Sequence, residues 1–194
     1  MFGKNHEIPA WETGPAGVQT LWPKEVGFDK FYGFFGGETD QYQPVLIDGI
    51  TRIKTPRKKD YHFTEDMTDK TIEWLNLEQS YNADKPFFIY YAPGAVHAPH
   101  HAPKEWIDKY KGKFSMGWDK LRQETFERQK ANNIIPKSTV LPPMPDFVPR
   151  WDSLTADEKR VFERQMEVYA GYLAHTDHEI GRVVETLKKN GEFD

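Results

Sequence analysis

The stretch KPFFIYYAPGAVHAPHHAP, residues 85–103, decides the fold class of this chain. Residues 87–91 form an unbroken apolar and aromatic run between Pro86 and Pro93, and such a run is typical of a buried strand in a parallel sheet. The preceding residues 64–80 have the spacing of a helix with one apolar face. A helix that is followed by a short loop and a buried strand predicts an α/β fold.

Capping residues predict where two helices begin. Thr64 is the expected N-cap of the first helix, and the acidic residues that follow it favour the helix dipole. Thr155 and Glu158 form a capping box, which predicts a long helix that ends before Gly191. The expected apolar face of this long helix consists of Phe162, Met166, Tyr169, Leu173, Ile180, Val184 and Leu187.

The rest of the chain is expected to hold short elements and long irregular loops. Short strands are expected over residues 1–7 and 45–47, and short helices over residues 104–110 and 118–130. Residues 8–60 are otherwise predicted to be irregular, and this part includes the aromatic segment 28–44, FDKFYGFFGGETDQYQP. The five prolines in residues 134–150 predict an extended surface connection. We therefore expect an α/β fold with a mixed or parallel sheet, flanking helices and long irregular loops.

Composition and charge exclude several classes of protein. The chain has 194 residues, of which 38% are hydrophobic and 29% are charged, as in a folded globular domain. The formal net charge of -4 implies no broad basic surface for nucleic acid or anionic membranes. No apolar run approaches the roughly 18 residues that span a bilayer, and the first residues lack the apolar core of a signal peptide. With 0 cysteines, disulfides, thiolate zinc sites and a cysteine nucleophile are excluded within this chain. The compartment is left undetermined.

The first residues, MFGKNHE, place a lysine and a histidine two positions apart. Side chains two apart in a strand point to the same face, so Lys4 and His6 are expected to project side by side. Such a pair suits the binding of an anion, and it equally suits an ordinary solvated strand end.

Histidines follow the predicted strand directly. His97 comes at the carboxyl end of that strand, which is where open α/β sheets bind ligands. His97, His100 and His101 also suggest zinc, but Pro99 interrupts their spacing and no cysteine or nearby carboxylate completes a ligand set. The pair at 175 and 178 falls on the long predicted helix, where solvated or capping histidines are the commoner case.

The residues alone therefore point to a site for an anionic substrate formed by Lys4, His6 and His97. No G-x-S-x-G nucleophile motif and no glycine-rich phosphate loop is present in the sequence.

Several stretches together resemble one known family. GKNHE at residues 3–7 resembles the G-K-x-H motif of sulfatases, and residues 85–103 resemble the K-P-F-F-x-Y and H-x-P segment of that family. YHFTEDMTDKTIEWL, from Tyr61, and MEVYAGYLAHTDHEIGRVVETLKKNGEFD, from Met166, are similar to it as well. The resemblance covers nearly the whole chain and is greatest to bacterial arylsulfatases, within the alkaline-phosphatase-like superfamily.

The resemblance implies roles for the candidate residues. In sulfatases the lysine and histidine of G-K-x-H contact the sulfate group and the leaving oxygen, and here they are Lys4 and His6. The histidine of H-x-P also faces the sulfate, and here it is His97. The implied substrate is a small-molecule sulfate ester, and the implied cofactors of the full-length enzyme are calcium and a formylglycine nucleophile.

This chain departs from the family pattern at the nucleophile and at the metal. It contains no C/S-x-P-x-R motif, from which the formylglycine is made, and neither the Asp pair nor the Asp-Asn pair that would bind calcium. We therefore expect residues 1–194 to be the central part of a sulfatase catalytic domain, with the nucleophile and the metal ligands outside them. By itself the chain is expected to be inactive.

Two other functions remain open from the sequence. The same superfamily includes phosphate and phosphonate monoester hydrolases, which a comparison of ester substrates would distinguish. A non-catalytic module that binds sulfated ligands through the same three residues would bind such a ligand saturably without turnover.

Overall fold

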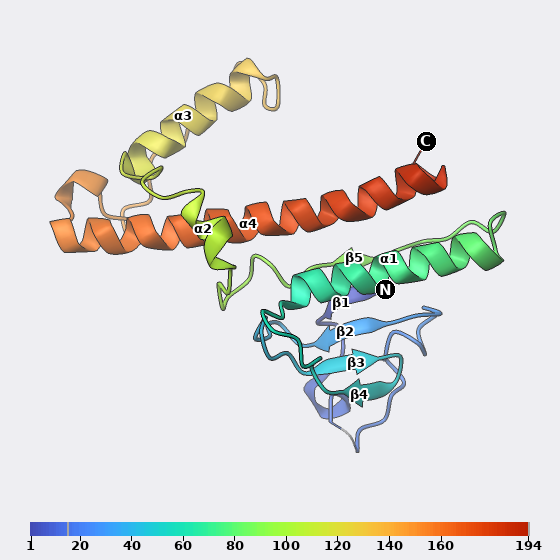
Figure 1. Ribbon diagram of the computed structural model, residues 1–194. Coiled ribbons are helices and arrows are strands. Elements are labelled where there is room, and N and C mark those ends of the chain that lie inside the picture. The colour runs from blue at the N-terminus through green and yellow to red at the C-terminus, as the bar shows by residue number, and fades with distance from the viewer. Residues whose placement is uncertain (15, 194) are drawn as a thin grey trace. The chain divides into compact units, whose positions relative to one another are not determined.

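The computed structural model describes residues 1–14 and 16–193, and the chain divides into two compact units (Figure 1). The first unit comprises Met1–His101 together with the chain from Tyr172 onward. The second unit is Ala102–Gly171. Each unit is described by itself below.

The first unit is built on a five-stranded sheet with the strand order β4-β3-β2-β1-β5. Its strands are β1 (Phe2–Asn5), β2 (Tyr32–Phe35), β3 (Leu46–Asp48), β4 (Thr51–Ile53) and β5 (Tyr91–Ala92). β1 pairs in parallel with both β2 and β5, whereas β3 is antiparallel to β2 and to β4. The prediction of a mixed sheet in an α/β fold is confirmed.

The expectation that the aromatic segment 28–44 is a loop is wrong in its centre. Tyr32–Phe35 form β2, which lies between β1 and β3, and only the residues on either side of it are irregular. The run YGFF contacts the core on both faces of the sheet, so it lacks the alternation of apolar and polar residues by which a half-buried strand is identified.

The prediction of a buried strand over residues 87–91 is also wrong. β5 consists of Tyr91 and Ala92 alone, and the side chains of Phe87, Phe88 and Tyr90 are 37%, 77% and 50% exposed. In the described sheet β5 is an edge strand that pairs with β1 on one side. An apolar run predicts burial only where neighbours cover it, and here Trp74 covers part of Phe87 while Phe88 and Tyr90 stay at least half-exposed.

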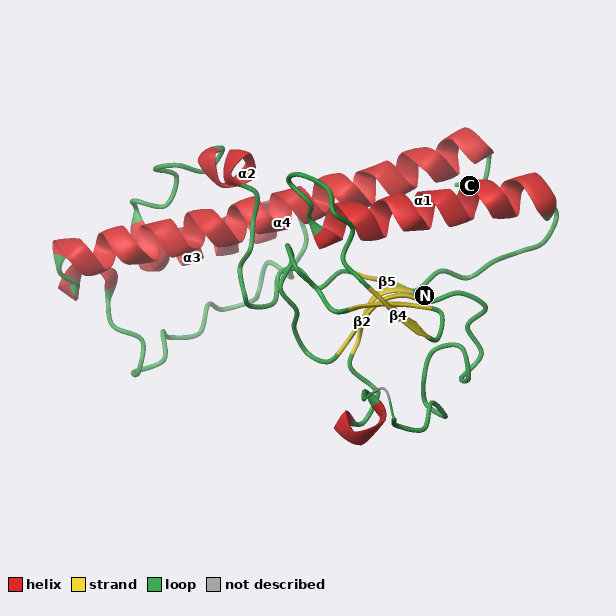
Figure 2. Cartoon of the chain, turned by 60° about the horizontal axis from the view of Figure 1, so that its bottom comes forward, coloured by secondary structure: helices red, strands yellow, loops and turns green. Residues whose placement is uncertain are grey.

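The core of the first unit lies on both faces of the sheet. On one face Phe2, Tyr32 and Phe34 pack against Phe63 and Met67 of α1 (Phe63–Tyr81). The other face is covered by the loop that carries the short 3-10 helix η1 (Ala10–Glu12), and Figure 2 shows this loop and α1 on opposite sides of the sheet. The buried residues of this second cluster are Met1, Ile8, Trp22, Phe31 and Ile47.

Two glycines allow β1 and β2 to pair closely. Gly3 and Gly33 are opposite one another in the register of these parallel strands. A Cβ atom at Gly33 would lie 1.8 Å from the carbonyl oxygen of Gly3, and one at Gly3 would lie 2.0 Å from that of Ala92. Because the obstacle at each position is backbone, neither position accepts a side chain.

Helix α1 confirms the prediction over residues 64–80, with a different cap. The helix begins at Phe63, and His62 is its N-cap: the backbone N–H of Thr64 donates to Nδ1 of His62 over 3.2 Å. Thr64 is itself fully buried inside the first turn. Histidine is an uncommon cap, so the usual preference for Thr, Ser, Asp or Asn placed the cap two residues late, at Thr64.

The long helix α4 (Ala156–Asn190) confirms the capping box. The backbone N–H and Oγ1 of Thr155 donate to the Glu158 carboxylate, and the backbone N–H of Glu158 donates to Oγ1 of Thr155. The expected apolar face is wrong in the first unit, where Leu173 and Ile180 are 52% and 40% exposed. The buried side chains there are Tyr172, His175, Thr176, Glu179 and Val183.

The second unit is helical. It contains α2 (Lys104–Asp108), α3 (Gly117–Ala131), a 3-10 helix (Trp151–Ser153) and the part of α4 up to Gly171. The ring of Trp118 contacts the rings of both Trp151 and Phe162. The helices α2 and α3 confirm the two short helices that were predicted over residues 104–110 and 118–130. Residues 134–150 form no helix or strand, as expected for a connection.

Candidate active site

The carboxyl ends of three parallel strands meet at one edge of the sheet. β2, β1 and β5 are neighbours and run in the same direction. Lys4 lies in β1 and His6 directly after it, and His97 lies in the segment after β5. The three predicted site residues therefore belong to the edge at which α/β sheets bind ligands.

The segment that follows β2 links these residues in space. Gly37 lies against the ring of His6, since a Cβ atom built on Gly37 would be 3.0 Å from Cε1 of His6. The next residue, Glu38, places a carboxylate oxygen 3.7 Å from Nδ1 of His97. Lys4 is half-buried and His6 is exposed. His6 and His97 thus lie near two consecutive residues, Gly37 and Glu38, of the segment after β2.

The contacts of His97 define which of its nitrogens faces the site. Nδ1 of His97 is 2.8 Å from the carbonyl oxygen of Ala98, which can only accept, so Nδ1 carries a hydrogen. When His97 is protonated, the Glu38 carboxylate lies at ion-pair distance. Both side chains are at least half-exposed, so this pair contributes little to stability.

A second group of side chains lies behind the segment that carries His97. Nε2 of His62 is 2.8 Å from the carbonyl oxygen of His101, and the backbone N–H of Gln41 donates to Nδ1 of His101 over 3.3 Å. The rings of Tyr42 and His101 are stacked, with centroids 5.4 Å apart. Residues 97–101 are therefore fixed at their far end to the cap of α1 and to the segment after β2.

Burial lowers the pKa of His62 to about 4, against the opposing effect of its hydrogen bond to the His101 carbonyl. His62 is therefore neutral at neutral pH. The carboxyl of Asp40 lies 3.4 Å from Nδ1 of His101. Although partial burial opposes it, hydrogen bonds from the backbone N–H groups of Tyr42 and Gln43 hold the pKa of Asp40 below its usual value.

Contacts between α1 and the latter part of α4 close this region. The ring of His175 meets the ring of His62 edge-on at 4.7 Å, and its Nε2 is 3.3 Å from a carboxylate oxygen of Glu65. The hydrogen bond with His175 lowers the pKa of Glu65. Arg182 adds ion pairs to Asp69 of α1 and to Glu179 of its own helix. These polar contacts explain why α4 buries a different face from the one that its apolar residues predict.

Sequence reasoning missed Glu38, Asp40 and His62 as members of this region. Glu38 and Asp40 follow β2, whose run YGFF lacks the alternation that identifies a strand, so the position of GGETD after a strand end is not evident from the sequence. Identification of β2 would have brought both carboxylates into consideration. His62 bonds to residues far from it in sequence, and no local pattern indicates that.

The described residues give the zinc alternative no support. Nδ1 of His97 contacts the Ala98 carbonyl and the Glu38 carboxylate, whereas Nδ1 of His101 contacts the Gln41 backbone N–H and the Asp40 carboxylate. Over residues 1–14 and 16–193, no three His, Cys, Asp or Glu side chains come together as metal ligands. This part of the chain therefore does not fit a calcium site by itself either.

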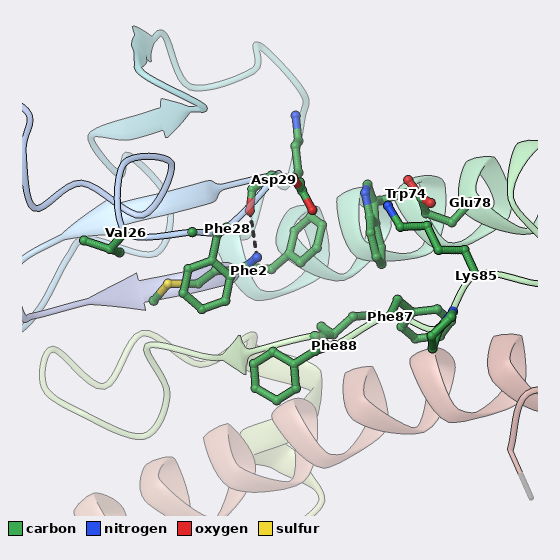
Figure 3. Close-up of a pocket in the computed structure, with 14 residues that line it drawn as sticks. Phe2, Val26, Phe28, Asp29, Trp74, Glu78, Lys85, Phe87 and Phe88 are labelled. Atoms are coloured by element: carbon green, nitrogen blue, oxygen red, sulfur yellow. Dashed lines mark hydrogen bonds between the residues drawn. The ribbon is translucent and has the colours of Figure 1, made fainter.

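Two of the cavities in the first unit lie beside the sheet. One of about 460 Å³ is lined by His6 and Arg52 and by apolar side chains that include Ile8, Phe35 and Ile47, so it adjoins the candidate site. The other, of about 410 Å³, lies at the amino ends of the strands and is drawn in Figure 3. Its labelled lining residues are Phe2, Val26, Phe28, Asp29, Trp74, Glu78, Lys85, Phe87 and Phe88. The cavity in Figure 3 contains none of the three predicted site residues.

Comparisons with known proteins identify the family. The sulfatase family model matches residues 1–194, and this chain belongs to the sulfatase family. An arylsulfatase from Klebsiella aerogenes is 29% identical over 181 residues, which are 87% of this chain and 38% of that protein. An uncharacterized sulfatase from Schizosaccharomyces pombe is 38% identical over 138 residues, or 70% of this chain and 24% of that protein. The chain thus spans well under half the length of these relatives.

Solved structures agree on the fold. The putative sulfatase yidJ from Bacteroides fragilis superposes with a TM-score of 0.63 at 18% identity, covering 100% of this chain and 38% of that one. The crystal structure of Ps i-CgsB in complex with k-i-k-neocarrahexaose gives a TM-score of 0.57 at 20% identity, covering 99% of this chain and 34% of that one. The fold is therefore part of the alkaline-phosphatase-like fold of sulfatases. Among the described helices none is both long and apolar enough to cross a bilayer.

Proposed function

We propose that the full-length protein, meaning the complete product of the gene that encodes this chain, hydrolyses sulfate monoesters of small molecules. In this proposal Lys4, His6 and His97 contact the sulfate group or the leaving oxygen. The observation that carries it is that His6 lies against Gly37 and His97 lies near the neighbouring Glu38, in the segment after β2 at the carboxyl edge of the sheet of a sulfatase-family chain. The similarity to an arylsulfatase supports an ester substrate.

Lys4 and His6 would act by charge. A sulfate monoester carries a negative charge, and its leaving oxygen gains more negative charge as the S–O bond breaks. Cations that are already in place stabilise this transition state more than the ground state, which is the condition for faster turnover. The half-buried position of Lys4 strengthens the effect, because water screens its charge less.

His97 would supply a proton. Its Nδ1–H is directed to the Ala98 carbonyl, so donation to the leaving oxygen must come from Nε2–H of the protonated ring. A carboxylate oxygen of Glu38 lies 3.7 Å from Nδ1 of the same ring. Departure of the leaving group as a neutral alcohol then leaves His97 neutral. General acid catalysis of this kind contributes on the order of 10²- to 10⁴-fold in rate.

Calcium and formylglycine belong to the proposal as parts of the full-length enzyme. The described residues do not assemble a metal site, and the sequence has no C/S-x-P-x-R motif. We therefore place the calcium ligands and the formylglycine in other parts of the full-length protein. The isolated 194-residue chain is accordingly expected to show no turnover of an aryl sulfate.

The test is the substitution His97→Ala in the full-length protein, with His178→Ala as the matched control. His178 is exposed on α4 and is not one of the residues assigned to the candidate site. We expect His97→Ala to lower kcat for an aryl sulfate by roughly 10²-fold or more, and His178→Ala to leave it unchanged. Equal turnover of the two variants would remove His97 from the site.

The choice of substrate tests the reaction class. The wild-type protein is expected to have a higher kcat/KM for an aryl sulfate than for the matching aryl phosphate or phosphonate. The reverse preference would establish a phosphate or phosphonate monoester hydrolase. Saturable binding of the sulfate ester by the full-length protein without any turnover would establish a binding module.

A further inference from the structure

His62 makes two hydrogen bonds that require one particular tautomer. The backbone N–H of Thr64 donates to Nδ1, which must therefore carry a lone pair. Nε2 must then carry the hydrogen, which it donates to the carbonyl oxygen of His101 over 2.8 Å. One neutral imidazole thus caps α1 with one nitrogen and holds the end of the 97–101 segment with the other.

The surroundings of His62 keep it in that state. Its side chain is 2% exposed, and burial disfavours the charged ring. The groups that face it come from every element around it: His175 and Tyr172 of α4, Glu65 of α1, Tyr42 of the segment after β2, and His101. Such a close-packed aromatic environment leaves the ring little freedom to turn.

The segment that His62 holds is the one that carries His97. It is short, and its internal bonds run from the N–H of His97 to the Gly94 carbonyl and from the N–H of His101 to the Pro99 carbonyl. Its far end contacts the remainder of the first unit through His101, by the bond to His62, the bond from Gln41 and the stacking on Tyr42. Glu38, the partner of His97, lies in the same segment as Gln41 and Tyr42.

We propose that His62 is a positioning residue of the active site, which fixes His97 relative to Glu38 and His6 by holding the carbonyl of His101. The assignment rests on the proposed function, because His97 is catalytic only in that reaction. His62 does not reach the substrate in this role, since it is buried behind the segment that it holds.

The two functions of the ring can be separated by two substitutions in the full-length protein. In His62→Asn the amide oxygen takes the place of Nδ1, so the cap of α1 is kept and the bond to His101 is lost. In His62→Gln the amide nitrogen takes the place of Nε2, so the bond to His101 is kept and the cap is lost. The measurements are kcat and KM for an aryl sulfate, thermal stability, and hydrogen exchange of the amides in residues 94–101.

If His62 positions His97, His62→Asn lowers kcat roughly 10- to 100-fold with little change in KM, and it accelerates exchange in residues 94–101. His62→Gln stays within about threefold of the wild type in kcat, although it loses the cap and hence more thermal stability. The opposite order, in which kcat follows thermal stability and His62→Gln is the slower variant, would overturn the proposal. Unchanged exchange and unchanged kcat in His62→Asn would do the same.

Two further measurements test the role of His62 if the proposed function fails or if His62→Asn does not fold. If the wild-type protein turns over no sulfate ester, the proposed function fails, and the exchange rates of the two variants alone decide whether His62 holds the segment. If His62→Asn does not fold, the ¹⁵N chemical shifts of the wild-type imidazole decide. A hydrogen on Nε2 and a bare Nδ1 at neutral pH support the role, and the opposite tautomer contradicts it.

Discussion

At the scale of single residues, His62 is a buried histidine whose pKa is lowered by its surroundings. A buried, neutral histidine stabilises the folded state only while the solvent does not favour its protonation. The ordinary pKa of histidine is about 6.5, whereas burial lowers that of His62 to about 4. Between these two values the unfolded chain binds a proton at this residue and the folded protein does not.

This difference predicts an acid-sensitive stability. Because the folded-state pKa is the lower one, the contribution of His62 is complete above pH 6.5 and is lost as the pH falls towards 4. A shift of this size corresponds to roughly 3 kcal/mol over that interval. We expect urea unfolding of the full-length protein to show the loss, and His62→Asn to show less of it.

The comparison between wild type and His62→Asn is the control for other titrating groups. Titrating groups that are distant from His62 cancel in the difference, whereas the coupling of His62 to its neighbours His175, Glu65 and His101 remains in it as part of the His62 effect. Parallel curves of unfolding free energy against pH for the two proteins would contradict the assignment of this sensitivity to His62.

At the scale of elements, the long helix α4 offers a matched pair of glycines. A Cβ atom at Gly171 would lie 2.7 Å from the Cα atom of Ile107, within the second unit. A Cβ atom at Gly181 would have nothing within 4 Å. Both glycines are in the interior of the same helix, so the change in helix propensity is alike for the two positions.

We therefore expect opposite effects from the same substitution. Gly181→Ala should raise the free energy of unfolding by about 0.5–1 kcal/mol, because alanine loses less backbone entropy in a helix. Gly171→Ala should lower it by about 1–3 kcal/mol, because the obstacle is backbone and cannot turn aside. Thermal unfolding of both variants of the full-length protein measures this, and a shift of the same sign in both would contradict it.

Elements also differ in how far the sequence predicts them. The existence of α1 and α4 followed from helical spacing and, for α4, from a capping box, whereas the cap of α1 and the buried face of α4 depend on contacts that are distant in sequence. β2 and β5 pair with strands that are distant in sequence. The aromatic composition of such a run does not tell whether the strand is central, as β2 is, or at the edge, as β5 is.

The residues of the candidate site also differ in whether the sequence predicts them. Lys4, His6 and His97 were predicted from a motif and from a position after a strand, and their roles stay predictions. Glu38 and His62 enter the site through contacts with residues that are distant in sequence, and no spacing rule reaches them.

At the scale of the whole molecule, aromatic side chains are exposed beside an edge of the sheet. Phe88 and Tyr90 are 77% and 50% exposed directly before β5, the edge strand of the described sheet. Unpaired strand edges with apolar neighbours favour association between chains. We expect the isolated 194-residue chain to aggregate through this edge.

A charge at the edge should reduce that aggregation. Phe88→Lys is expected to raise the soluble fraction of the isolated chain, measured by light scattering and sedimentation at matched concentration. Phe147→Lys is the control, because Phe147 is even more exposed, at 87%, but lies in the helix- and strand-free connection of the second unit. An equal gain from both substitutions would point to general hydrophobicity and away from the sheet edge.

The facing glycines of β1 and β2 have a consequence for how this family member can diverge. At Gly3 and Gly33 the space for a side chain is taken by carbonyl groups of the neighbouring strands. A second substitution elsewhere can shrink a side chain, but it cannot move these carbonyls without separating the strands. Neither position therefore has a compensating mutation within reach. In a library of variants both codons should stay fixed as glycine.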